Sequence, residues 1–132
     1  MLPSFPAPTR AFLGCLALVA APLAAATPRI DFAREIQPIL AQRCFDCHGA
    51  DKAKGGLHLH TRANALRGGE SGEPALIAGN SAKSLLLQRI LTDDENDVMP
   101  QKGDRLPPAE VAKLKQWIDE GAIWPDNLKH WA

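Results

Sequence analysis

The stretch Cys44-Phe45-Asp46-Cys47-His48 places two thiols and an imidazole close together in the chain. On a helical turn, residues three and four positions apart share one face, so these three side chains can reach the same bound group. The spacing is typical of c-type haem attachment, in which both thiols add to the haem vinyl groups. The imidazole then serves as the proximal ligand of the iron. The stretch therefore predicts haem c, with Cys44 and Cys47 as covalent attachment sites and His48 as an iron ligand.

Three other uses of the two thiols compete with haem. A structural zinc site takes about four ligands, usually as two spaced pairs, and the sequence has no second CxxC. A thioredoxin-like redox pair is found in a βαβ context, and the sequence shows no such alternation. A plain disulfide fits an oxidising compartment but gives no reason for the adjacent His48. Haem is therefore the preferred interpretation of this stretch, and zinc or a simple disulfide are the alternatives.

Length and charge limit the classes of function. The chain has 132 residues, enough for one domain. Its 15 Lys and Arg residues balance its 15 Asp and Glu residues. No overall field therefore favours nucleic acid or an anionic membrane as a partner. Tyrosine is absent, and a porphyrin could supply apolar volume that aromatic side chains otherwise provide.

Residues 1–26 are predicted to form a signal peptide. Arg10 closes a short first region, an apolar run covers residues 11–21, and Ala24-Ala25-Ala26 offers an A-x-A cleavage site. The run is short for a membrane span, so we expect no span after cleavage; an uncleaved N-terminal anchor is the alternative. Cys15 gives only a faint lipoprotein signal, because most of the apolar run follows it instead of preceding it.

Export agrees with the haem prediction, because covalent haem attachment in bacteria takes place outside the cytoplasmic membrane. We therefore expect a periplasmic protein in which residues 27–132 form a single domain. Cys44 and Cys47 would then be its only cysteines.

The first and last segments of this domain are expected to be helices. Residues 31–43 combine an N-cap at Asp31 with an apolar face, and Pro38 should kink the helix or mark a restart. Residues 107–121 carry one apolar stripe and a stop at Gly121. The stripe should pack against the first helix, because neither amphipathic face is stable alone in water.

Between these two helices the signals are weaker. The glycine-rich residues 49–79 are expected to be irregular. Residues 81–91 are expected to form a helix, capped by Asn80 or Ser81 and buried because it is apolar on most sides. The acidic residues 93–97 could bind calcium, but their spacing is not that of an EF-hand, and a solvated turn is the preferred interpretation.

Met99 is predicted to be the second axial ligand of the iron. It is the only methionine left after cleavage, and a thioether is a natural haem ligand. A buried gap-filling methionine is the alternative, although residues 93–97 and 101–102 on either side of this stretch are polar or charged. His58, His60 and His130 compete with it. His58 and His60 follow closely after His48, and the alternative interpretation is that both are surface residues. His130 lies in the tail, and chain termini are the least well ordered part of most domains.

Several short stretches occur in the order seen in one known family. They are Ile36-Gln37-Pro38-Ile39-Leu40, Cys44-Phe45-Asp46-Cys47-His48-Gly49, Gly55-Gly56-Leu57, Ser84-Leu85-Leu86, Met99-Pro100, and Trp117-Ile118-Asp119-Glu120-Gly121-Ala122 with Trp124-Pro125. Through them the chain resembles the planctomycete-type cytochrome c domain over residues 31–125. The resemblance implies an all-α, cytochrome c-like fold whose first and last helices cross around one haem. It also implies Cys44 and Cys47 as attachment sites, His48 as proximal ligand and Met99 as distal ligand.

Two features depart from that family. An acidic residue often stands where this chain has His60, so the family role of that position does not transfer. Family members often sit inside large multi-domain proteins, whereas this chain ends soon after the domain. We therefore expect its redox partners to be separate molecules.

The sequence thus predicts a periplasmic mono-haem cytochrome that carries single electrons between an electron donor and an acceptor protein. With His48 and Met99 on the iron, no position is open for a substrate, so we expect no enzymatic activity. The alternative is a haem-based sensor, or an enzyme-associated haem module, with a weakly held sixth ligand. A two-haem peroxidase would need a second CxxCH, which the sequence lacks. A non-haem module, with a disulfide or a metal at the two cysteines, is the third hypothesis.

Overall fold

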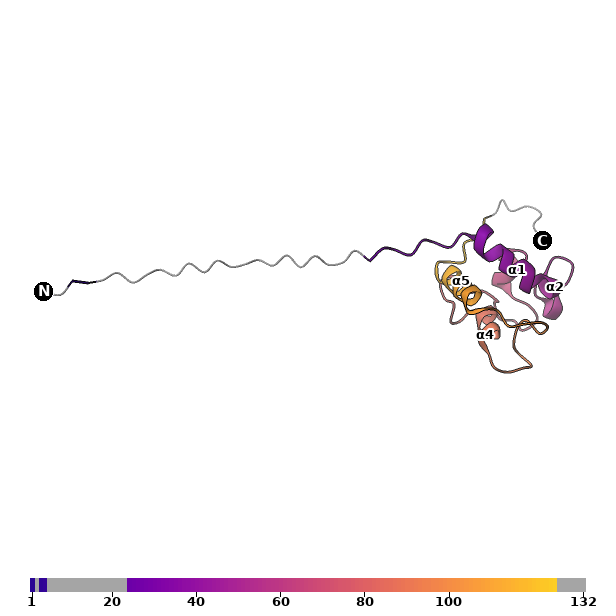
Figure 1. Cartoon of the computed structure of the whole chain (residues 1–132). Coiled ribbons are helices and arrows are strands. Elements are labelled where there is room, and N and C mark those ends of the chain that lie inside the picture. The colour runs from indigo at the N-terminus through magenta and orange to yellow at the C-terminus, as the bar shows by residue number, and fades with distance from the viewer. Residues whose placement is uncertain (2, 5–23, 126–132) are drawn as a thin grey trace.

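The computed structural model describes residues 1, 3–4 and 24–125. The described residues form helices and no strand, which confirms the all-α prediction (Figure 1). The elements are η1 (Phe32–Ile36), α1 (Gln37–Arg43), α2 (Phe45–His48), η2 (Lys54–Gly56), α3 (Arg62–Arg67), α4 (Leu85–Leu91) and α5 (Pro108–Asp119). None of these helices is long and apolar enough to cross a membrane. Most of the predicted signal peptide, including Cys15, and also His130 lie outside the described residues.

The first helix is capped as predicted and restarts at its proline. The Asp31 carboxylate accepts a hydrogen bond from the Arg34 N–H (3.0 Å), and Glu35 accepts one from the Asp31 N–H (2.9 Å). The π-helical turn η1 then gives way to α1, and Pro38 occupies the first turn of α1. A proline is tolerated there because its missing N–H would have had no helical partner.

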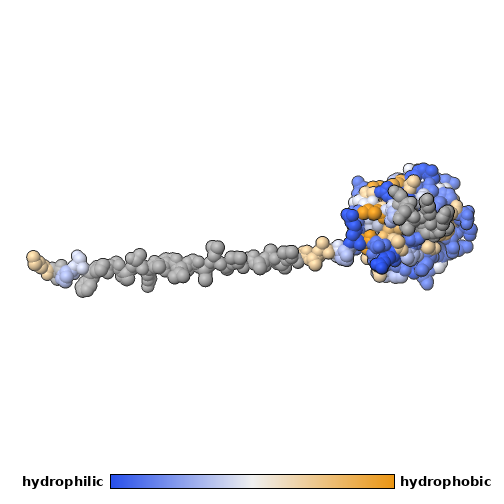
Figure 2. Space-filling model, turned by 90° about the horizontal axis from the view of Figure 1, so that it is seen from above, coloured by the Kyte–Doolittle hydropathy of each residue, from blue (hydrophilic) through white to orange (hydrophobic). Residues whose placement is uncertain are grey.

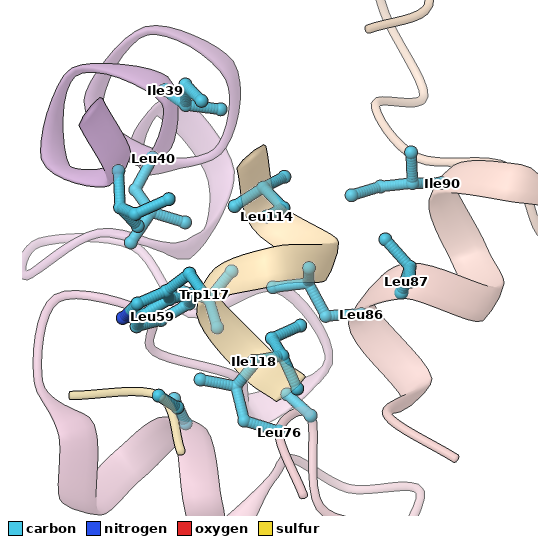
Figure 3. Close-up of a cluster of buried hydrophobic side chains, with 14 of the residues drawn as sticks. Ile39, Leu40, Leu59, Leu76, Leu86, Leu87, Ile90, Leu114, Trp117 and Ile118 are labelled. Carbon is cyan, nitrogen blue, oxygen red and sulfur yellow. The ribbon is translucent and has the colours of Figure 1, made fainter. Parts of the chain in front are cut away.

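The last helix, α5, forms the centre of the core. It starts with Pro108 in its first turn, and Gly121 follows it at φ +109°. Figure 3 shows Leu114, Trp117 and Ile118 of α5 lying between α1 and α4. The rings of Phe32 in η1 and Trp117 are 5.6 Å apart, so the predicted packing of the last helix against the first is confirmed. Burial of each large apolar side chain contributes about 1.5–3 kcal/mol.

The chain after α5 folds back onto the same aromatic cluster. The Trp124 ring lies 4.5 Å from the Phe32 ring and 5.7 Å from the Trp117 ring. The Trp117 indole N–H donates to the Ile123 carbonyl (2.8 Å). Trp131, the other tryptophan of the tail, lies outside the described residues.

The second predicted helix is shorter than expected. Helix α4 begins at Leu85, so the predicted caps at Asn80 and Ser81 are wrong. The cause is Ser84, a buried residue whose hydroxyl donates to the Asn80 carbonyl (2.8 Å) and accepts from the Ile77 N–H (2.9 Å). These bonds hold the preceding residues in a non-helical turn. Leu91 is 58% exposed, so the prediction that this helix is buried on most sides is also wrong for its last residue.

Residues 49–79 are irregular except for the short helices η2 and α3, and the prediction missed α3. Thr61 caps α3 by accepting a hydrogen bond from the Asn64 N–H (3.3 Å). Gly68 ends it at φ +84°, and a Cβ at this position would lie 1.9 Å from the Glu73 carbonyl oxygen. Only Ala65 of this helix is buried, so its apolar periodicity is too weak to be seen in the sequence.

Candidate haem-binding site

A cavity of about 560 Å³ brings the four predicted site residues together. Its size lies within the range of about 300–1,000 Å³ that is usual for cofactor pockets. Its wall includes Cys44, Cys47 and His48, the last two from α2, and Met99 from the loop after α4. The apolar part of the wall comes from Leu57, Leu59, Ala75, Leu85, Leu86, Ile90 and Leu106. Two thiols, two axial donors and an apolar lining are the donor set and surroundings that a covalently attached haem requires.

A helical turn places the CxxCH side chains on the cavity. Helix α1 leads into Cys44, whose N–H donates to the Leu40 carbonyl (2.9 Å). The Cys44 carbonyl then accepts from the N–H groups of Cys47 (3.2 Å) and His48 (2.8 Å). The two cysteines are free thiols and not a disulfide. Burial raises the pKa of the Cys44 thiol to about 12, although the neighbouring Arg43 charge acts in the opposite direction. Before any group is attached, the Cys44 thiol is therefore neutral at physiological pH.

The His48 ring is oriented by the segment of residues 57–59. Its Nδ1 lies 3.2 Å from the Leu57 carbonyl oxygen, and a hydrogen on Nδ1 donates to that oxygen. This tautomer leaves the lone pair of Nε2 free to bind a metal. The Leu59 N–H donates to the His48 carbonyl (2.7 Å), and His58 Nδ1 lies 2.7 Å from the Gly49 carbonyl. The segment thus runs along the end of α2 and fixes the imidazole.

The two nearby histidines lie away from this cavity. Leu57 and Leu59 belong to its wall, whereas His58 and His60, which alternate with them, do not. Such alternation is expected of an extended segment, in which successive side chains point to opposite faces. Both imidazoles are half-buried, and their rings pack edge to face at 5.2 Å. Both histidines therefore keep part of their surface exposed, and neither lines the cavity.

Met99 is held in the cavity wall by its own backbone. Its N–H donates to the carbonyl of Arg89 in α4 (2.9 Å), and its side chain is half-buried. The acidic run just before it is an exposed turn in which Asp97 pairs with Arg89 and Asp93 pairs with Arg105. Among the residues that the structure describes, no group of three or more Cys, His, Asp or Glu side chains gathers to bind a metal ion.

Sequence reasoning missed an ion pair that fixes the start of the motif. The Arg43 guanidinium donates to both carboxylate oxygens of Glu110, from Nε at 3.0 Å and from Nη2 at 3.1 Å. Hydrogen bonding to Glu110 and its charge raise the pKa of Arg43. Arg43 directly precedes Cys44 and Glu110 lies on α5, so the pair ties the haem motif to the central helix. Arg43 and Glu110 lie 67 positions apart in the chain, and nothing in the sequence between them would predict this contact.

The comparisons with known proteins agree with the resemblance seen in the motifs. The family model of planctomycete cytochrome C matches residues 44–103, from the first thiol to the loop that carries Met99. No curated protein matches, and no solved structure matches either.

Proposed function

Because residues 44–103 match the planctomycete cytochrome C family, we propose that the protein is a mono-haem c-type cytochrome that carries single electrons between separate redox proteins. The observation that supports this best is the single cavity whose wall includes Cys44, Cys47, His48 and Met99. A bound haem would supply the one-electron chemistry of its iron, while the chain binds the group and tunes its potential.

Each of the four residues has one role in this proposal. Cys44 and Cys47 would hold the haem through thioethers, and His48 and Met99 would ligate its iron. The apolar wall keeps water away and lowers the local dielectric, which favours the iron state of lower net charge. Since both axial positions are taken, we propose that the protein transfers electrons and catalyses no reaction of its own.

The fold and the compartment complete the proposal. The packing of α5 against η1 supports a cytochrome c-like arrangement, with the first and last helices joined behind the cavity. The sequence of residues 1–26 supports export, and the periplasm is where the two thiols would meet haem. The redox partners would then be other exported proteins.

Covalent attachment is tested by expressing the full chain in a host with a working haem maturation system. The purified protein should keep its haem on a denaturing gel and gain the mass of one haem. The double substitution Cys44→Ser and Cys47→Ser should lose both properties. A colourless unaltered protein, or one with a disulfide between the two cysteines, would overturn the proposal.

The sixth ligand is tested by the ferric absorption spectrum of the haem-loaded protein. Ligation by Met99 should give a weak charge-transfer band at the red end of the visible range, and Met99→Ala should remove the band while the haem stays attached. Replacing a thioether also lowers the reduction potential, because sulfur ligation favours ferrous iron. Val98→Ala is the matched control, because Val98 directly precedes Met99 but does not line the cavity.

Two results would change this assignment. If the band survives in Met99→Ala while His58→Ala, His60→Ala or His130→Ala alters the low-spin spectrum, the sixth ligand is a histidine. If the unaltered protein is high-spin and binds carbon monoxide readily in the ferrous form, the sensor alternative, with its weakly held sixth ligand, is the better assignment.

A further inference from the structure

The loop that carries Met99 needs something to hold it in place. It runs from α4 to α5 over residues 92–107 and contains no helix. Residues 93–97 and 101–105 are exposed. Yet residues 99–104 and Leu106 form part of the cavity wall. A long exposed loop has few buried contacts to oppose local opening, so the polar contacts of the residues close to Met99 decide whether Met99 stays at the cavity.

Arg89 supplies the first of these contacts through both its backbone and its side chain. Its carbonyl accepts the Met99 N–H at 2.9 Å, and its guanidinium forms an ion pair with Asp97. The Arg89 side chain is 34% exposed and that of Asp97 is 52% exposed. Arg89 lies on the packed helix α4, so the stretch from Asp97 to Met99 is fastened at both ends to a rigid element.

Gln101 supplies the second contact from the other side of Met99. Its side-chain amide donates to the Val98 carbonyl at 2.9 Å and to the Asn96 carbonyl at 3.2 Å. One side chain thus bridges the residues before and after Met99. Two carbonyls of the turn are satisfied without any help from α4.

We propose that Arg89 and Gln101 are positioning residues that hold the Met99 loop against the cavity. They thereby set the fraction of molecules in which the thioether stays on the iron. This inference rests on the proposed function, since it gives these contacts a role only if Met99 is the sixth ligand. Arg89 acts through two different groups, so only the part carried by its side chain can be removed by substitution.

The test uses the full-length, haem-loaded ferric protein and imidazole as the probe. Imidazole binds only those molecules in which Met99 has left the iron, so its affinity reports how often the loop opens. Asp97→Asn removes the ion pair without changing a residue of the cavity wall. Since an exposed pair contributes little, imidazole should bind about 1.5- to 5-fold more tightly to this variant. Gln101→Ala should act in the same direction.

Asp93→Asn is the matched control. It makes the same change of charge in the same acidic run, but Asp93 pairs with Arg105 and not with Arg89. Its imidazole affinity should equal that of the unaltered protein. Arg89→Met should tighten imidazole binding, because it removes the ion pair with Asp97. Arg89→Lys keeps the charge and the backbone bond, so it should bind imidazole nearly as weakly as the unaltered protein does.

The outcomes distinguish the assignment of Met99 as sixth ligand from the positioning role of Arg89 and Gln101. An unaltered protein without the charge-transfer band has no Met99 ligation, which overturns both the sixth-ligand assignment and the positioning role. A protein that has the band, but binds imidazole equally in Asp97→Asn and Asp93→Asn, overturns the role of the Arg89 side chain alone. If Gln101→Ala has no effect, Gln101 is not a positioning residue. Neither of these last two results touches the haem assignment.

Discussion

Gly49, the residue that follows His48, lies directly against the backbone of α2. A Cβ at this position would lie 2.6 Å from the Phe45 carbonyl oxygen and 3.2 Å from the Phe45 Cβ. Backbone atoms of a helix cannot move aside cheaply, so Gly49→Ala should destabilise the protein by about 1–3 kcal/mol. In urea unfolding, the midpoint should fall while the slope stays the same.

The neighbouring position offers the control for this substitution. Ala50 is exposed, so Ala50→Ser adds an atom where solvent can accommodate it and should leave the urea midpoint unchanged. An unchanged midpoint in Gly49→Ala would mean that the end of α2 can shift without cost. The fixed orientation of His48 would then have to come from residues 57–59 alone.

At the scale of single residues, the sequence could predict a functional role only where the side chain itself and its local spacing indicate one. The spacing of Cys44, Cys47 and His48 is local, so it brings three donors to one cavity through a single helical turn. The Leu57 carbonyl that orients His48 is a backbone group, which any residue would have supplied. Arg89 and Gln101 are ordinary polar residues in the sequence. Their contacts with the Met99 loop depend on the three-dimensional course of that loop, which the sequence does not indicate.

At the scale of elements, the Arg43–Glu110 pair connects the end of α1 to the first turn of α5. Its side chains are 29% and 24% exposed, and the two parallel hydrogen bonds fix their geometry. Glu110→Gln keeps the shape but removes the charge. It should lower the thermal midpoint of unfolding, because Arg43 then loses its charged partner beside the haem motif.

The fall in the thermal midpoint caused by Glu110→Gln should depend on the presence of Arg43 and of no other residue. Arg43→Met alone should lower the thermal midpoint, and adding Glu110→Gln to it should lower the midpoint little further. Lys113→Gln on the same helix is the control, because Lys113 forms only a longer contact with Glu35, at 3.7 Å. Strictly additive effects of the two substitutions would show that the pair contributes no stability of its own.

Helices were predictable where periodicity was long and caps were local. Helix α5 has the long periodicity and a stop at Gly121, and η1 starts at the side-chain cap of Asp31. Helix α4 begins later than its apolar pattern suggests, because the buried Ser84 hydroxyl bonds the Asn80 carbonyl, which a longer helix would have used. Helix α3 has six residues and depends on tertiary contacts, since helices this short are not stable alone.

At the scale of the whole molecule, the core and the cavity share residues. Leu86, Ile90 and Leu106 belong to the buried cluster and also to the cavity wall. A haem bound there would therefore extend the core that α5 forms with α1 and α4 (Figure 3). On the face shown in Figure 2, the surface of the folded part is largely hydrophilic, with small scattered hydrophobic areas. The cavity of about 560 Å³ is where an apolar group of this size would be accommodated.

Acid stability of the whole molecule should depend on Asp119, at the end of α5. Its carboxylate accepts hydrogen bonds from Lys115 Nζ (2.7 Å) and from the Ser81 N–H (2.9 Å). The bond from Lys115 and then the bonds from Ser81 lower the pKa of Asp119 from 3.8 to about 2. The unfolded chain therefore binds this proton more readily than the folded chain, so the stabilisation is complete above about pH 4 and is lost as the pH falls toward 2. The side chain is 38% exposed, so solvent screening keeps the effect modest.

Asp119→Asn should remove this part of the pH dependence. Urea unfolding between pH 6 and pH 2 should show a shallower loss of stability below pH 4 in the variant than in the unaltered protein, because one fewer group takes up a proton on unfolding. The variant should also be less stable near neutral pH, where the bond from Lys115 loses its charged acceptor. Asp51→Asn, at an exposed position, is the control, because it removes one carboxylate but neither of those two bonds. Identical pH profiles for Asp119→Asn and the unaltered protein would show that the end of α5 is held to residue 81 by packing and not by this carboxylate.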